Sequence, residues 1–134
     1  MIGFENIKQK LFPEDILVFE KKYNVKLPQE YINHMLVFNG GYPENDVYFD
    51  RYPIDGFRSI KYGNHKVEDD IDSLSEFLPD QSIPFAYSTG GFIYMALNKK
   101  DNGKIYITYS DGQTNFLANS FKEFIKGLSE EQEL

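Results

Sequence analysis

Residues 83–109 read IPFAYSTGGFIYMALNKKDNGKIYITY, and this stretch decides the fold class. It contains three segments rich in aromatic and β-branched residues, which are typical of strands: 83–87, 92–97 and 104–109. Between the last two segments, Asp101-Asn102-Gly103 indicates a hairpin, because an Asn-Gly pair favours two successive positive φ angles. Consecutive strands joined by tight turns predict antiparallel pairing.

Helices are expected on both sides of this stretch. The first begins at Pro13 and ends near Asn24, and two acids after Pro13 suit the positive end of the helix dipole. The second begins at Pro28 and ends at Asn39-Gly40-Gly41, where glycine supplies a left-handed cap. A capping box, Ser120-Phe121-Lys122-Glu123, predicts a third helix near the C-terminus, followed by an acidic tail, 130–133, that we expect to fray.

The middle of the chain is more mixed. We expect short strands at 47–49 and 57–60 with a turn around Pro53, Asp55 and Gly56, then a short helix over 68–77 that Pro79 ends. One more strand is expected at 113–117. The predicted class is α+β: a single domain over residues 1–134, with a mainly antiparallel sheet packed against N-terminal helices and a C-terminal helix.

Composition excludes several classes of function. The chain has 134 residues, a length typical of one domain, and no cysteine, which excludes disulfides, thiolate metal sites and a cysteine nucleophile. With 21 acids against 14 bases the formal net charge is −7, which argues against direct nucleic-acid binding. The N-terminus lacks the pattern of a signal peptide, and no apolar run approaches the roughly 20 residues needed to cross a membrane. We therefore expect a cytoplasmic protein without a membrane partner.

The motifs that usually carry catalysis or metal binding do not stand out. His34 and His65 are isolated from each other, so no metal site is predicted. The densest acidic run, Glu68-Asp69-Asp70-Ile71-Asp72, lacks the glycine of a calcium loop, and we interpret it as a solvated first turn of a helix. No catalytic residue and no cofactor are expected. A hydrolase that uses a carboxylate pair remains an alternative, and it needs two acids about 5–10 Å apart in a cleft.

Charge is concentrated in one part of the chain. Residues 44–80 hold ten acids and four bases, a net charge of −6, whereas the segments before and after carry 0 and −1. Solubility alone is one explanation for this charge. Acids interleaved with aromatic residues also suit a protein interface, because localised charge steers a basic partner to one face. The predicted contact residues are Asp46, Tyr48, Asp50, Tyr52, Asp55, Glu68, Asp69, Asp70 and Asp72.

Several motifs together resemble a known family. Leu27-Pro28-Gln29-Glu30-Tyr31 followed by Asn39-Gly40-Gly41 is similar to the LP-x-[DE]-[YF]…NGG signature of the SUKH superfamily, also called the Smi/Knr-like family. The resemblance continues in order through Ile83-Pro84-Phe85-Ala86, Gly90-Gly91, Gly103-Lys104-Ile105-Tyr106 and Ser120-Phe121-x-x-Phe124. One departure is the absence of tryptophan, which many members carry in the core.

The resemblance implies a single α+β domain and, for bacterial members, an immunity role. Such a protein binds and neutralises a cognate polymorphic toxin, often a nuclease, by occluding its functional surface. We therefore expect a basic nuclease domain as the partner. The alternative that fungal relatives suggest is a regulatory adaptor, a protein-binding module without a toxin partner. The residues leave self-association open.

Overall fold

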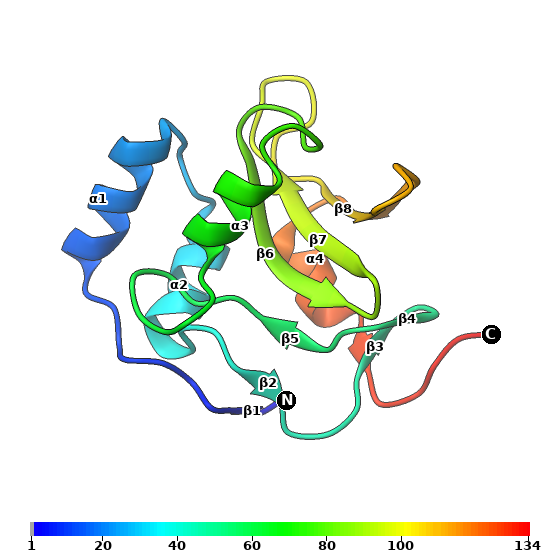
Figure 1. Ribbon diagram of the computed structural model, residues 1–134. Coiled ribbons are helices and arrows are strands. Elements are labelled where there is room, and N and C mark those ends of the chain that lie inside the picture. Colours follow the sequence, from blue (N-terminus) through cyan, green and yellow to red (C-terminus); the bar gives the residue numbers. More distant parts are fainter. Residues whose placement is uncertain (1) are drawn as a thin grey trace.

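A five-stranded antiparallel sheet lies at the centre of the computed structural model, which describes residues 2–134 (Figure 1). Its strands, in spatial order, are β5 (Gly56–Phe57), β6 (Ser82–Ser88), β7 (Gly91–Ala96), β8 (Ile105–Tyr109) and β9 (Thr114–Ala118). Every pairing in this sheet is antiparallel. The predicted α+β class and the three long strands of residues 83–109 are confirmed.

The connection between β7 and β8 differs from the expected turn. Gly103 has a φ of 90°, but Asn102 is not among the residues with positive φ, so the predicted pair of positive φ angles is wrong. The connection is a longer loop in which the Asn98 side chain accepts a hydrogen bond from the Asp101 N–H at 2.9 Å. Because the loop is closed by several hydrogen bonds, a two-residue turn is not needed.

Two helices precede the sheet, as predicted: α1 (Pro13–Tyr23) and α2 (Gln29–Val37). Asn24 ends α1 with a φ of 52°, in the left-handed region. The glycine cap predicted for α2 is wrong, because the helix ends at Phe38 in an extended conformation and the two glycines follow later. Gly40 instead permits close contact, since a Cβ there would lie 2.9 Å from the Ser59 backbone nitrogen.

Hydrogen bonds of the Asn39 side chain hold Gly40 close to Ser59. The buried Asn39 side chain donates to the carbonyls of Gln9 and Ile60, both at 2.9 Å, and accepts from the Ile60 N–H at 2.8 Å. The motif that resembles a helix stop therefore joins three segments of the chain.

Aromatic side chains attach α2 and α4 (Phe121–Lys126) to the sheet. The Phe121 ring lies 5.1 Å from that of Tyr31 on α2 and 5.4 Å from that of Phe85 on β6, and the Phe124 ring lies 5.5 Å from Phe85. These residues are fully buried or nearly so, and they form part of one continuous core. The serine half of the predicted capping box is confirmed, because the Ser120 hydroxyl accepts from the Glu123 N–H at 3.0 Å. The reciprocal bond to the Glu123 side chain is not formed within residues 2–134, where that carboxylate accepts from the Asn119 side chain instead.

Short elements complete the fold. The helix α3 (Val67–Ser73) packs beside β6 and stops before Phe77, so the predicted end at Pro79 is wrong. Two small antiparallel sheets pair β1 (Phe4–Glu5) with β2 (Tyr42–Pro43), and β3 (Tyr48–Phe49) with both β4 (Tyr52–Pro53) and β10 (Leu128–Ser129). None of the helices described within residues 2–134 has the length and apolar character needed to cross a membrane.

Two predictions about the middle and the tail are corrected by the small sheet around β3. The turn lies at Asp50-Arg51, where Asp50 has a φ of 56°, and Pro53 is in a strand instead. The tail does not fray at 130–133. The Gln132 side chain donates to the Arg51 carbonyl at 2.8 Å, and the Glu133 N–H donates to the Asp50 carbonyl at 3.0 Å.

Candidate acidic interface

The nine residues predicted as contacts lie in two separate places. Figure 1 shows α3 and the β3–β4 hairpin well apart, on different sides of the central strands. The hairpin and its flanks carry the first group: Asp46, Tyr48, Asp50, Tyr52 and Asp55. The helix α3 carries the second group: Glu68, Asp69, Asp70 and Asp72. The structure therefore divides the acidic segment 44–80 into two surfaces.

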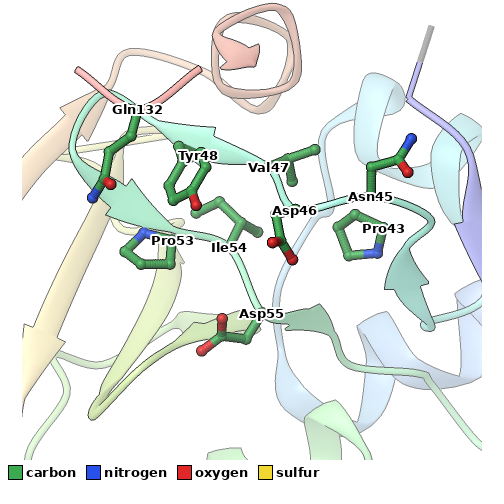
Figure 2. A pocket seen from close by; sticks show the side chains of 9 residues that line it. All are labelled: Pro43, Asn45, Asp46, Val47, Tyr48, Pro53, Ile54, Asp55 and Gln132. Carbon is green, nitrogen blue, oxygen red and sulfur yellow. The ribbon is translucent and has the colours of Figure 1, made fainter. Parts of the chain in front are cut away.

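A hollow with a volume of about 330 Å³ opens beside the hairpin, and we call it the acidic hollow (Figure 2). Two segments that run side by side form it, one on each side of the β3–β4 turn. Its lining residues are Pro43, Asn45, Asp46, Val47, Tyr48, Pro53, Ile54, Asp55 and Gln132. Three of the predicted contacts, Asp46, Tyr48 and Asp55, thus share one concave surface.

The local sequence explains why these carboxylates face outward. Val47 and Ile54 are each only 3% exposed, and the Ile54 N–H donates to the Val47 carbonyl at 3.0 Å. Their neighbours in sequence, Asp46 and Asp55, are exposed, because adjacent residues of an extended chain point to opposite faces. Two buried aliphatic anchors therefore hold the two acids at the rim.

Neither the acids of the hollow nor Asp50 of the adjacent turn pairs with a cation within residues 2–134. Asp46 and Asp50 make no side-chain hydrogen bond or ion pair with any of residues 2–134. Asp55 accepts one hydrogen bond, from the Thr89 hydroxyl at 2.9 Å, and pairs with no cation in the same part of the chain. The hollow therefore presents uncompensated negative charge beside the ring of Tyr48.

The acids of α3 are mostly occupied by internal partners. Asp70 is 1% exposed, and its carboxylate contacts Arg58 Nε at 2.9 Å and His65 Nε2 at 2.6 Å. The Arg58 guanidinium also lies over the ring of Tyr87, 4.1 Å from its centroid. This arrangement links α3 to the end of β5 and to β6, and it leaves the Asp70 carboxylate inaccessible to a partner.

The carboxylates of Asp69 and Glu68 accept hydrogen bonds from backbone N–H groups at and near the start of α3. The Asp69 carboxylate accepts from the Lys66 N–H at 2.8 Å, and this hydrogen bond is the main cause that lowers the pKa of Asp69. Glu68 accepts from the Lys61 N–H at 2.8 Å. Of the four acids, only Asp72 is exposed without an internal hydrogen bond or ion pair to residues 2–134.

Neither histidine belongs to the acidic hollow. His65 contacts Asp70, as described above. His34 lies among the rings of Phe4, Phe38, Phe57 and Phe121, with centroids 5.2–5.6 Å away. Its enclosed Nε2 has no hydrogen-bond partner within residues 2–134, and burial lowers the pKa of His34 to about 4. Across the same residues, no group of three or more His, Asp or Glu side chains is placed to hold a metal ion.

Some lining residues of the acidic hollow were not predicted from the sequence. Gln132 lines it from the C-terminal tail, which the acidic composition marked only as a segment that frays. Pro43, at the end of β2, and Asn45, in the loop after it, also line the hollow. No local pattern identifies Gln132, because its position depends on pairing between segments about 80 residues apart.

Comparison with known proteins gives two matches. Residues 11–127 match the SMI1/KNR4 family (SUKH-1). A protein of Bacillus subtilis (strain 168), named immunity protein YxxD, is 31% identical over 116 residues, which cover 83% of this chain and 75% of that protein. The family match includes the β3–β4 hairpin and every lining residue of the acidic hollow except Gln132.

Proposed function

The chain belongs to the SMI1/KNR4 family (SUKH-1), and on that premise we propose that it is an immunity protein, which binds a toxin and occludes the toxin's functional surface. The observation that carries the role is the 31% identity with immunity protein YxxD over most of both chains. The proposal assigns no catalytic step to this chain. Its only chemistry is recognition of another protein.

We place the toxin contact at the acidic hollow. Asp46 and Asp55 are exposed and pair with no cation within residues 2–134, and Tyr48 offers an aromatic surface on β3, next to the buried Val47. Interfaces combine such aromatic anchors with charged groups at their rim. Asp50 and Tyr52, on the same hairpin, extend this surface. Asp70 is left out of the proposed contact because it is buried against Arg58 and His65.

The chemistry of the hollow indicates the kind of toxin. Negative charge that pairs with no cation among residues 2–134 attracts a cationic surface and raises the rate of association with it. A nuclease domain has such a surface, because it must bind phosphates. We therefore propose a basic nuclease as the partner, with lysine or arginine side chains seated between Asp46 and Asp55. Such a complex blocks nucleic acid from the toxin without contacting nucleic acid itself.

Co-expression tests this proposal. The wild-type chain is produced together with candidate toxins encoded beside its gene, and cell survival is scored. We expect survival with the cognate toxin and about a 100-fold loss of affinity for the double variant Asp46→Lys/Asp55→Lys. A matched control, Asp72→Lys/Glu76→Lys on and just after α3, makes the same change in net charge on exposed residues away from the hollow.

The outcomes separate the role from the surface. If the wild type protects against none of the adjacent toxins but binds a host regulatory protein, the adaptor alternative replaces the immunity role. If the wild type protects and both double variants lose affinity equally, the immunity role stands and the acidic hollow is not the contact. Circular dichroism of each variant verifies that it is folded.

A further inference from the structure

The outer edge of the five-stranded sheet is unpaired. β9 is the last strand in the sheet order, and Figure 1 shows this orange strand at the margin of the molecule. Its neighbour on the inner side is β8, with Tyr106 opposite Phe116 and Thr108 opposite Thr114. An edge strand of this kind is a template for another strand.

Hydrogen bonding around the β8–β9 turn identifies which backbone groups point outward. The Tyr109 N–H donates to the Gln113 carbonyl at 3.0 Å, so residue 113 faces β8. Because facing alternates along an antiparallel strand, residue 115 also faces β8, and the N–H and C=O groups of Thr114 and Phe116 face away. Neither residue's backbone bonds to a loop, helix or side chain within residues 2–134.

The side chains on this edge are uncharged and partly apolar. Residues 113–119 read QTNFLAN and lack the charges and prolines that commonly protect an edge strand, although the β8–β9 pairing has a bulge near Leu117. On the outer face a row of rings runs toward the edge: the Tyr94 and Tyr106 centroids lie 5.5 Å apart, and those of Tyr106 and Phe116 5.9 Å apart. Phe116, at the end of the row, is 51% exposed.

We propose that a second copy of this chain pairs with β9 across a twofold axis, antiparallel, with Thr114 of one copy opposite Phe116 of the other. This register lets the outward N–H and C=O groups of both residues bond to the other copy, and it packs each Phe116 ring against a threonine of the other copy. The two central sheets then form one continuous ten-stranded sheet.

Charge favours a second copy over the basic toxin as the occupant. The edge carries no acid to attract a cationic surface, whereas two copies that meet at this edge place no like charges of residues 113–119 opposite each other. The net charge of −7 on each chain still opposes association at long range. β9 is only five residues long, so pairing along it buries a small area compared with the roughly 1,200 Å² that stable interfaces bury. We therefore expect a weak dimer that forms with rising concentration.

Sedimentation of the full chain over a range of concentrations tests this proposal. Two variants act on the edge: Phe116→Lys adds repelling charge, and Thr114→Pro removes the outward N–H without removing a bond to β8. We expect a monomer–dimer equilibrium in the wild type and at least a 10-fold weaker one in both variants. The matched control is Phe77→Lys, which replaces another exposed phenylalanine, 70% exposed and in a loop away from β9.

Hydrogen exchange adds a direct readout at the edge. The amides of Thr114 and Phe116 should exchange more slowly as the concentration of the wild type rises. A wild type that stays monomeric at every concentration overturns the proposal. A dimer that Phe77→Lys weakens as much as Phe116→Lys also overturns it, as does an edge that becomes protected only when a toxin is added. Thermal unfolding verifies that the Thr114→Pro and Phe116→Lys variants are folded.

Discussion

His34 illustrates at the scale of one residue how burial sets a charge state. Four phenylalanine rings surround the imidazole, and its enclosed Nε2 has no partner among residues 2–134. Desolvation therefore favours the neutral ring, which lowers the pKa of His34 to about 4 in the folded chain, against 6.5 for an exposed histidine.

This shift predicts a loss of stability in weak acid. Between pH 6.5 and about 4 the unfolded chain binds a proton at His34 that the folded chain does not, so stability is complete above pH 6.5 and is lost as the pH falls. We expect the free energy of unfolding in urea to drop by about 2 kcal/mol from pH 7.5 to pH 5 through this residue.

The variant His34→Phe separates this effect from other titrations. Phenylalanine suits the aromatic surroundings and does not titrate, so the variant should lose most of the drop between pH 7.5 and pH 5. The control His65→Gln changes the exposed histidine and should keep it. An unchanged drop in His34→Phe would show that another group causes the pH dependence.

At the scale of elements, the β3–β4 hairpin depends on the C-terminal tail. β10 pairs with β3, the Gln132 side chain reaches the Arg51 carbonyl, and the Glu133 N–H reaches the Asp50 carbonyl. Two-residue strands have little stability of their own, so these bonds from the far end of the chain help to fix the hairpin.

Removal of residues 130–134 should therefore loosen the hairpin without unfolding the molecule. The deletion removes the two hydrogen bonds between the tail and the hairpin but keeps β10 and the buried Leu128. Since a hydrogen bond contributes about 1 kcal/mol, hydrogen exchange at the hairpin amides should rise by about 10-fold or more, with little change in the exchange of β6–β8. The double variant Glu130→Ala/Glu131→Ala, which keeps Gln132 and Glu133, is the control. Equal exchange in the deletion and the control would mean that the tail does not fix the hairpin.

The difference between long strands with local signals and short strands that depend on distant partners explains how far the sequence predicts the fold. β6, β7 and β8 are long, and their composition and turns are local signals, so they could be predicted. β4 and β10 could not, because each exists only through its partner: Tyr48 pairs with Pro53, and Phe49 with Leu128.

The candidate site, too, could be predicted from the sequence only where the signal is local. The density of acids in 44–80 locates Asp46 and Asp55, which the structure brings to one hollow. The burial of Asp70 depends on Arg58, which directly follows β5 and which the helix meets only in the folded chain, and no local pattern marks it.

At the scale of the whole molecule, the acids of residues 44–80 divide into those that pair within the chain and those that do not. The carboxylates of Asp69 and Asp70 pair with bases of the same chain, while those of Asp46, Asp50 and Asp55 remain uncompensated around the hairpin. The net charge of −7 does not show this uneven pairing of the acids along residues 44–80.

This asymmetry predicts a strong salt dependence of toxin association. Raising ionic strength from about 0.05 M to 0.5 M should slow association with the cognate toxin by about 10-fold and change dissociation much less, because salt screens long-range steering. Surface plasmon resonance measures both rates. The variant Asp46→Asn/Asp55→Asn should lose much of the dependence, and Asp72→Asn/Glu76→Gln should keep it. Equal salt dependence in both variants would place the steering charge elsewhere.

The lack of internal partners for Asp46 has an evolutionary consequence. A substitution there breaks no hydrogen bond and no ion pair of the fold described for residues 2–134, whereas a substitution of Asp70 leaves Arg58 without its carboxylate. The lineage is thus free to exchange residues at the rim of the hollow at little cost to folding, as long as Val47 and Ile54 keep the segments in place. Under the proposed function, this arrangement would allow the recognition surface to change while the core stays constant.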